Sequence, residues 1–218
     1  SQLALDTVVA SQTAMDAVIA SQLALDTVVA SQTAMDAVAA SQTAMDAVAA
    51  SQTAMDAVVG GIASFTTFLG SQYVVNSAWA SQLASETIWN AGNFVQDNTN
   101  FGFWQKDVDL TDKTTITVWT RAQNGTPDLT IRIDGSTEFS TDSDHSSYTE
   151  RTIDVSGYSG THTLELGLQG YDNSPDDYLQ DFYNGRTGSG GSLYIHMETF
   201  GGVGASSEYA EFSDLQIT

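Results

Sequence analysis

The residues best suited to chemistry gather in the long segment 170–191, where aromatic and acidic side chains alternate. Tyrosine and phenylalanine rings present flat apolar faces on which sugar rings can stack. Carboxylates accept hydrogen bonds from hydroxyl groups or coordinate Ca²⁺ through oxygen. The segment is longer than a connection between strands needs, which favours a binding role. We therefore predict a glycan site here, with no cofactor except an unassigned Ca²⁺. Its candidate residues are Tyr171, Asp172, Asp176, Asp177, Tyr178, Phe182 and Tyr183.

Trp119 is a further candidate for sugar binding. It shares strand parity with Thr115 and Thr117, so it faces away from Ile116 and Val118. Such a tryptophan is either an exposed platform for a sugar or a buried contact between subunits. The long segment has a structural alternative too, as a strap whose rings pack on the domain or on a neighbouring subunit.

No pattern typical of an active site accompanies these residues. The chain has no cysteine, no nucleophile elbow, no phosphate-binding loop, no zinc-ligand spacing and no calcium loop of standard length. Of the three histidines, His162 shares parity with Leu164, which favours a core or rim histidine. His196 lies opposite Ile195 on its strand, and His145 lies in a polar loop. We predict that the protein is not an enzyme and has no catalytic residue. The metal ligands stay unassigned.

The elements that must position these residues are short alternating strands with Gly and Asp turns. Asn124-Gly125 between the first two strands indicates a hairpin. With no helical pattern among the strands, this part is predicted to be a jelly-roll β-sandwich. The predicted strands span 115–122, 129–133, 149–155, 161–168, 192–200 and 208–217.

The N-terminal part is an internal repeat, with six copies of the decad S-Q-[TL]-A-[ML]-D-[AT]-V-x-x over residues 1–60. Alanine and methionine favour a helix, and apolar residues at positions 4, 5 and 8 of the decad form one stripe. A single Ala-rich helix is marginal in water, so we predict a homotrimeric coiled coil. The predicted oligomer core is Met45, Val48, Met55, Val58, Phe65 and Phe68.

Two features of this shaft stay open. To keep its apolar stripe on one seam, a helix with a ten-residue repeat needs about 3.33 residues per turn. The remaining core layer of each decad would then be either a ring of glutamines or a layer of serines. A quadrilateral β-helix is the less favoured alternative to the helix, because the two halves of the decad share no pattern.

The decad register continues, in diverged form, to about residue 90, and its side chains are larger there, as at Phe65, Phe68 and Trp79. We predict a decad-repeat shaft over 1–60, a hydrophobic neck over 61–92 and a β-sandwich over 93–218. The fold class is thus α+β by segregation. Because the repeat is already running at Ser1, we expect this sequence to be part of a longer chain.

The charge of the chain limits its partners. There are 27 Asp and Glu residues against six Lys and Arg, a formal net charge of −21. Such a chain repels phosphate backbones, so we expect no nucleic-acid partner. No apolar run is long enough to span a membrane, and we expect no membrane insertion. So acidic a composition suits strong salt screening, as in halophilic organisms, and the alternative is an ordinary acidic secreted or virion protein.

Two parts of the sequence resemble known families. The decads, such as SQTAMDAVAA, resemble repeats in tail-fibre proteins of tailed viruses. The stretches DVDLTDKTTITVWTRA, RTIDVSGYSGTHTLELGL and EFSDLQIT look like jelly-roll modules of haloarchaeal surface and viral proteins, similar to carbohydrate-binding domains.

These resemblances imply a virion tail fibre, located on the virion or outside the cell. Its sandwich would attach to a host-surface glycan or glycoprotein, and its shaft would contact other tail proteins. The alternatives are a structural spacer that binds no receptor and, less favoured, a depolymerase acting on surface polysaccharide.

Overall fold

Each decad forms one short α-helix followed by a turn. The computed structural model describes residues 2–96, 101–123, 129–141, 145–169, 179–184, 193–199 and 208–218. Within these residues the helices are α1 (Gln2–Val9), α2 (Gln12–Ile19), α3 (Gln22–Val29), α4 (Gln32–Ala39), α5 (Gln42–Ala49), α6 (Gln52–Val59), α7 (Ile62–Leu69), α8 (Val74–Ser77) and α9 (Gln82–Asn90).

The serine at position 1 of the decad explains why the helices are short. In α5, Ser41 has an extended backbone, and its hydroxyl accepts a hydrogen bond from the Ala44 amide at 3.3 Å. This is an N-cap, a strong signal for a helix start. The same cap recurs at Ser11, Ser21, Ser31, Ser51 and Ser81. Each of these decads therefore begins its own helix after a two-residue turn, whereas α7 follows Gly61 and α8 follows Tyr73, both without a side-chain cap.

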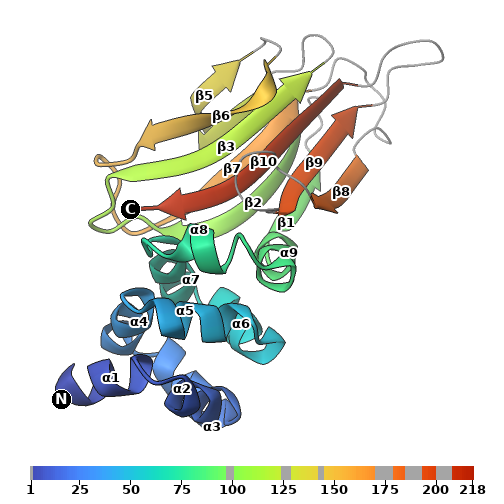
Figure 1. Cartoon of the computed structure of the whole chain (residues 1–218). Coiled ribbons are helices and arrows are strands. Elements are labelled where there is room, and N and C mark those ends of the chain that lie inside the picture. The colour runs from blue at the N-terminus through green and yellow to red at the C-terminus, as the bar shows by residue number, and fades with distance from the viewer. Residues whose placement is uncertain are drawn as a thin grey trace.

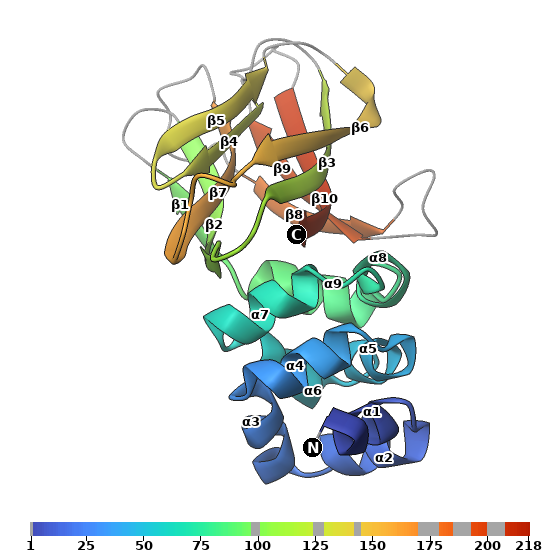
Figure 2. The same cartoon turned by 90° about the vertical axis from the view of Figure 1, so that its left-hand side faces the viewer.

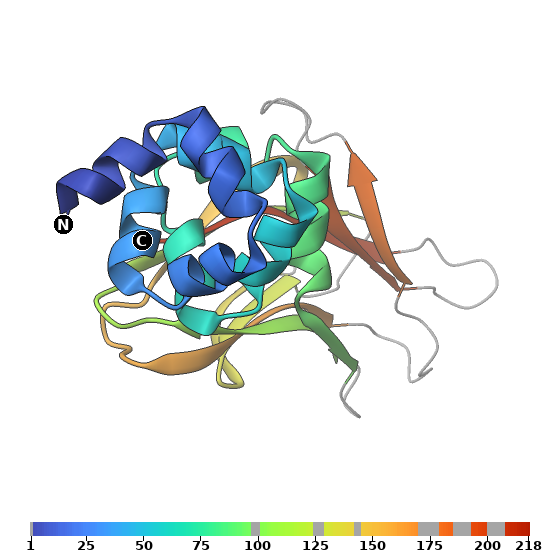
Figure 3. The same cartoon turned by 90° about the horizontal axis from the view of Figure 1, so that it is seen from below.

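Three consecutive helices complete one turn of a solenoid, here called a tier. Each helix packs on the helix three places further on, as α1 does on α4 and α4 on α7. Figure 2 shows the resulting tiers, α1–α3, α4–α6 and α7–α9, stacked under the strands. Figure 3 looks at the stack from the end where the first tier lies nearest the viewer. The prediction of helix is thus confirmed, but the prediction of a long coiled coil is wrong. Because the chain changes direction at the turn after each eight-residue helix, the ten-residue period needs no supercoil.

The predicted oligomer core lies inside the single chain. The side chains of Met45, Met55 and Phe65 are fully buried. They belong to one buried cluster formed within this single chain, so their burial requires no partner chain. Val48, Val58 and Phe68 are buried in the same core.

The segment predicted as a neck is the third tier, and it packs on the β-sandwich. Its bulky residues fill this junction, because the tier meets a sheet instead of another layer of alanine-rich helices. Trp79, Trp89 and Trp104 are fully buried there, with ring centroids 5.0 and 5.2 Å apart. The Trp104 indole donates to the Trp89 carbonyl at 2.8 Å. A side chain at Gly92 would collide with the Trp104 ring, which explains the glycine.

Lys106 fastens the two parts of the molecule together. Its ammonium donates to the carbonyls of Val59 at 3.0 Å and Ala91 at 3.3 Å, at the C-terminal ends of α6 and α9. Both carbonyls lie where a helix dipole favours a cation. The ammonium also lies 5.2 Å from the centre of the Phe65 ring.

The strands form a sandwich of two antiparallel sheets, as predicted. Figure 1 shows it above the helices. Sheet A has the order β1-β2-β7-β4-β5 and sheet B the order β6-β3-β10-β9-β8. Buried Ile, Leu, Val and Phe side chains fill the space between them. The strands are β1 (Asn93–Gln96), β2 (Phe101–Asp109), β3 (Thr115–Gln123), β4 (Leu129–Ile133), β5 (Ser136–Thr141), β6 (His145–Asp154), β7 (Thr161–Gln169), β8 (Leu179–Asn184), β9 (Leu193–Thr199) and β10 (Glu208–Ile217).

The hairpin predicted around Asn124-Gly125 is wrong. Strand β3 lies in sheet B and β4 in sheet A, so the chain crosses from one layer to the other. Both strands alternate toward the same core, and alternation cannot distinguish a paired strand from a facing strand. The hairpin lies one turn later, between β4 and β5. There Asp134 and Gly135 have φ of 50° and 79°, as a type I′ turn requires.

Candidate functional site

The most elaborate group of polar side chains lies on the outer face of sheet B. Strand parity directs one set of β3 residues into the core, and places Trp119 and Arg121 on the opposite face. Register then aligns Arg121 with Glu211 of β10, and Glu211 with His196 of β9. We call this group the Glu211 cluster. It consists of Arg121, Gln123, Tyr148, Tyr194, His196, Tyr209 and Glu211.

Glu211 is the centre of the cluster and is only 1% exposed. Arg121 binds its carboxylate with two parallel hydrogen bonds, of 2.5 Å from Nε to Oε2 and 2.9 Å from Nη2 to Oε1. The Tyr148 hydroxyl donates to Oε2 at 3.0 Å, and His196 Nδ1 lies 3.1 Å from Oε1. A buried charge is tolerated only when it is paired and hydrogen-bonded, and these three partners meet that condition.

The partners determine the protonation of the cluster. Burial would raise the pKa of Glu211, but the hydrogen bonds from His196 and Arg121 outweigh it and hold that pKa below its ordinary value. The hydrogen bond to Glu211 raises the pKa of Arg121. Burial raises the pKa of the Tyr148 hydroxyl. At neutral pH the carboxylate and guanidinium charges therefore cancel.

Aromatic rings surround this ion pair. His196 stacks on Tyr209 with ring centroids 5.1 Å apart. The Arg121 guanidinium lies 5.3 Å from the centre of the Tyr148 ring and 5.5 Å from that of Tyr209. Tyr194 lies 6.0 Å from Tyr148. The three tyrosines are half-buried, so each ring keeps part of its surface accessible.

The residues predicted for glycan binding are only partly placed by the structure. Trp119 faces away from the core as predicted, is half-buried, and lies opposite Ser213 of β10 on the same face as Arg121. The backbones of Phe182 and Tyr183 belong to β8, and register places Tyr183 opposite Tyr194. The remaining candidates lie outside the described residues: Tyr171, Asp172, Asp176, Asp177 and Tyr178.

Sequence reasoning missed most of the Glu211 cluster. The outward parity of Arg121 was readable, because it lies two residues from Trp119 on one strand. That Glu211 and His196 would lie beside it depends on the pairing of β3 with β10 and of β10 with β9. Strand order is a tertiary property, and no spacing in the sequence indicates it.

The other two histidines have local structural roles. His162 is a rim residue, as predicted, with Nδ1 at 2.7 Å from Asp134 Oδ2 and Nε2 at 3.1 Å from the Ser159 carbonyl. His145 begins β6, and its Nε2 lies 3.2 Å from the Thr120 hydroxyl.

The described residues hold neither a metal-binding cluster nor a membrane-spanning helix. No three His, Cys, Asp or Glu side chains there lie close enough together to hold a metal ion. No described helix has both the length and the apolar character needed to cross a lipid bilayer.

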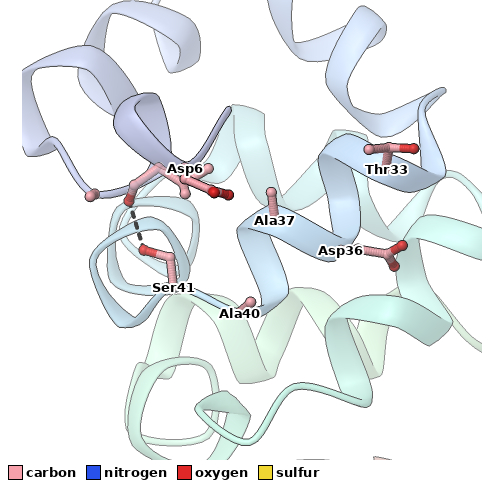
Figure 4. A pocket seen from close by; sticks show the side chains of 8 residues that line it. Asp6, Thr33, Asp36, Ala37, Ala40 and Ser41 are labelled. Carbon is pink, nitrogen blue, oxygen red and sulfur yellow. Dashed lines mark hydrogen bonds between the residues drawn. The ribbon is translucent and has the colours of Figure 1, made fainter. Parts of the chain in front are cut away.

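A hollow of about 410 Å³ is lined by residues of α1, α4 and the turns that follow them. Figure 4 shows Asp6 and Asp36 near it, and Ser41 reaching toward α1. The Ser41 hydroxyl donates to the Val9 carbonyl at 2.7 Å. The rest of the wall consists of small or apolar residues such as Ala37. The hollow is therefore a packing gap between tiers.

Comparisons with known proteins identify no family. The chain matches no protein-family model and no curated protein. Among solved structures it is similar to a carbohydrate-binding module, described as CBM36 in complex with calcium and xylotriose. The identity is 15%, the TM-score is 0.27, and the match covers 55% of this chain and 78% of that chain. So distant a similarity places neither a sugar nor an ion on this chain.

Proposed function

We propose that this protein is a surface-recognition protein whose sandwich binds a glycan on the outer face of sheet B. The stacked helices serve as a rigid spacer behind it. The observation that carries the proposal is the Glu211 cluster, in which three half-buried tyrosines surround a neutralised ion pair. Sugar sites combine aromatic faces with a few oriented polar groups, and the cluster offers both.

The charge of the cluster favours a neutral glycan. Arg121 and Glu211 cancel each other, while the whole chain carries a formal charge of −21. An anionic sugar would approach against that charge. Hydroxyl groups of a neutral sugar can instead exchange hydrogen bonds with tyrosine hydroxyls and with Gln123, whose amide oxygen already accepts from Tyr209 at 2.5 Å.

The proposal is binding without catalysis. Glycoside hydrolysis needs a pair of carboxyl groups, one of them an acid with a raised pKa. The pKa of Glu211 is shifted the other way, and its carboxylate already accepts from Arg121, Tyr148 and His196.

We place this activity in a tail fibre of a virus, with a host-surface glycan or glycoprotein as the partner, because the decads resemble fibre repeats. The predicted homotrimer is not part of the proposal. Its physical reason was that the decads lack a core of their own, and the tiers supply that core within one chain.

Binding of the whole chain to a glycan array and to cells tests the proposal. Tyr194→Ala and Tyr209→Ala should each weaken binding about tenfold, the usual contribution of one aromatic contact. Tyr158→Ala is the matched control, because Tyr158 lies beside His162, away from the Glu211 cluster. The folded state of each variant is checked by circular dichroism.

Equal losses in all three variants, or no glycan binding by the unmodified chain, would contradict the proposal and favour a spacer that binds no receptor. Release of reducing sugar from a bound polysaccharide would favour the depolymerase.

A further inference from the structure

The first tier has an exposed face whose equivalents in the second tier are buried. In α4, Ala34, Ala37 and Val38 are at most 7% exposed, because α1 covers them. The corresponding residues of α1 are Ala4 and Thr7, which are exposed, and Val8, which is half-buried. The leucines at position 3 lie at the edge of this face and are exposed, with Leu3 at 76% and Leu23 at 78%. Their equivalents in the second tier, Thr33 and Thr53, are exposed too. We call this surface the open face. It consists of Ala4, Thr7, Val8, Ala14, Ala17, Val18, Ala24, Thr27 and Val28.

The junction between the second and third tiers shows which polar contacts join two tiers. The glutamine at position 2 of a decad donates to the hydroxyl at position 7 of the decad three places further on. Gln52 donates in this way to Thr87 Oγ1 at 3.0 Å, while Thr87 donates to the Leu83 carbonyl at 2.7 Å. Equivalent bonds of 2.8 Å join Gln32 to Thr67 and Gln42 to Ser77.

The open face carries the acceptor half of this contact. Thr7 donates to the Leu3 carbonyl at 2.8 Å and Thr27 to the Leu23 carbonyl at 2.7 Å, as Thr87 does to Leu83. Within the described residues no glutamine donates to either threonine. The second tier, which the first tier already covers, has alanine at this position, namely Ala37, Ala47 and Ala57. Acceptor hydroxyls thus occur at this position in the third tier, which glutamines of the second tier reach, and in the uncovered first tier, whereas the second tier has none.

We propose that the open face is a docking surface for one more tier of three S-Q decads. Such a tier would cover Ala4, Thr7 and Val8 as the first tier covers Ala34, Ala37 and Val38. It would also direct the glutamines of its first and third decads toward Thr7 and Thr27. Each glutamine would then lie 35 residues before its threonine, the same spacing as between Gln52 and Thr87.

A second copy of the described chain does not fit this surface. Two open faces placed together would bring acceptor hydroxyls and apolar side chains from both sides, without a glutamine donor for either threonine. The opposite end of the solenoid is covered by the sandwich, where α7 and α9 pack on β2, β10 and β9. The donor must therefore be a tier of decads with its glutamines toward the open face.

The test is an extended chain that carries three decads of the sequence SQTAMDAVAA before Ser1. Hydrogen exchange should show protected amides in the added helices. It should also show at least about tenfold slower exchange at Val8 and Val28 than in the unextended chain. The matched control is the same extension with alanine in place of glutamine in its first and third decads. In that control, the amides of Val8 and Val28 should exchange about tenfold faster than with the glutamine extension, as expected for two lost hydrogen bonds.

A double variant, Thr7→Val with Thr27→Val, distinguishes the proposed contact from general stacking. It should reduce protection in the extended chain to the level of the alanine control, and leave the unextended chain unchanged. Three outcomes would overturn the proposal. The added decads could exchange as an unfolded chain, or the glutamine and alanine extensions could be equally protected. The unextended chain could also form a dimer in analytical ultracentrifugation that Leu3→Lys with Leu23→Lys abolishes, which would make a second copy the occupant.

Discussion

At the scale of single residues, Glu211 shows how a sheet surface can hold a buried charge. Its carboxylate lies on the outward face of a strand, yet it is 1% exposed because the rings of neighbouring strands cover it. The ion pair with Arg121 fixes the guanidinium against Tyr148 and Tyr209. The pair therefore orients the rings that the proposed glycan would contact.

Removal of one partner of this pair should cost more than removal of both. Arg121→Met leaves a buried carboxylate without its main partner, and the free energy of unfolding should fall by about 3 kcal/mol or more. Arg121→Met combined with Glu211→Leu removes the charge as well, and should be less destabilised than the single variant. Urea unfolding at neutral pH measures both. If the double variant were the less stable of the two, the desolvation argument would be wrong.

The rim pair His162–Asp134 should make stability depend on pH. The hydrogen bond to Asp134 raises the pKa of His162 above 6.5, and the bond from His162 lowers the pKa of Asp134 below 3.8. The histidine contribution is complete below pH 6.5 and is lost as the pH rises through the raised value, whereas the aspartate contribution is lost in acid. In His162→Gln the stability difference between about pH 5 and pH 8 should shrink, by under ~1 kcal/mol because the pair is partly exposed. Thermal melts of both proteins across this range measure it, and parallel pH profiles would contradict it.

At the scale of elements, the serine at position 1 has two functions. It caps the helix of its own decad, and it can also bind the tier before it. Ser41 donates to the Val9 carbonyl, Ser71 to Ala39 and Ser81 to Ala49, always 32 residues back. One residue type thus marks where a helix begins and also provides a hydrogen bond to the preceding tier.

Ser41 and Ser31 separate these two functions. Both cap a helix, and the described contacts of Ser31 show the cap alone, whereas Ser41 also bonds to Val9. Ser31→Ala should cost about 1 kcal/mol for the lost cap. Ser41→Ala should cost about 1 kcal/mol more, since it also leaves a carbonyl without its donor. Chemical unfolding of the two variants gives the comparison, and equal losses would mean that the bond between tiers contributes nothing.

At the scale of the whole molecule, the sandwich closes one end of the solenoid. Repeat proteins need such a terminal cap, because each repeat buries its apolar surface only against its neighbours. Here the third tier has Phe65, Trp79 and Trp89 in place of the smaller Met35, Ala49 and Val59 of the second tier, and all three rings are fully buried. The helices and the sandwich therefore form one continuous core.

The two lysines of the chain provide a test of this junction. Lys106 binds carbonyls at the ends of two helices, whereas no described hydrogen bond involves the ammonium of Lys113. Lys106→Met should lower the free energy of unfolding by about 1.5–3 kcal/mol, the usual contribution of a hydrogen bond to a charged group. Lys113→Met is the matched control and should change it by less than ~0.5 kcal/mol. Similar losses in both variants would mean that Lys106 does not join the two parts.

The sequence by itself determined the local features of this protein. The decads specify helices because alanine, methionine and the apolar stripe favour them, and the alternation in β3, β7 and β10 specifies strands with one buried face. The outward position of Trp119 and the rim position of His162 follow from the same parity. These properties depend on neighbours within one turn or one strand, so a short window of sequence contains them.

Only the tertiary structure decided how these elements meet. A stripe on a helix needs a cover, but the stripe is the same whether the cover is another chain or a helix 30 residues further on. The serine caps were the available signal for a solenoid, since they divide the repeat into helices too short for a coiled coil. Likewise, strand order brings Arg121, Glu211 and His196 together from three strands. Contacts between distant segments form because together they bury the most apolar surface with every polar group satisfied, and no local pattern records that choice.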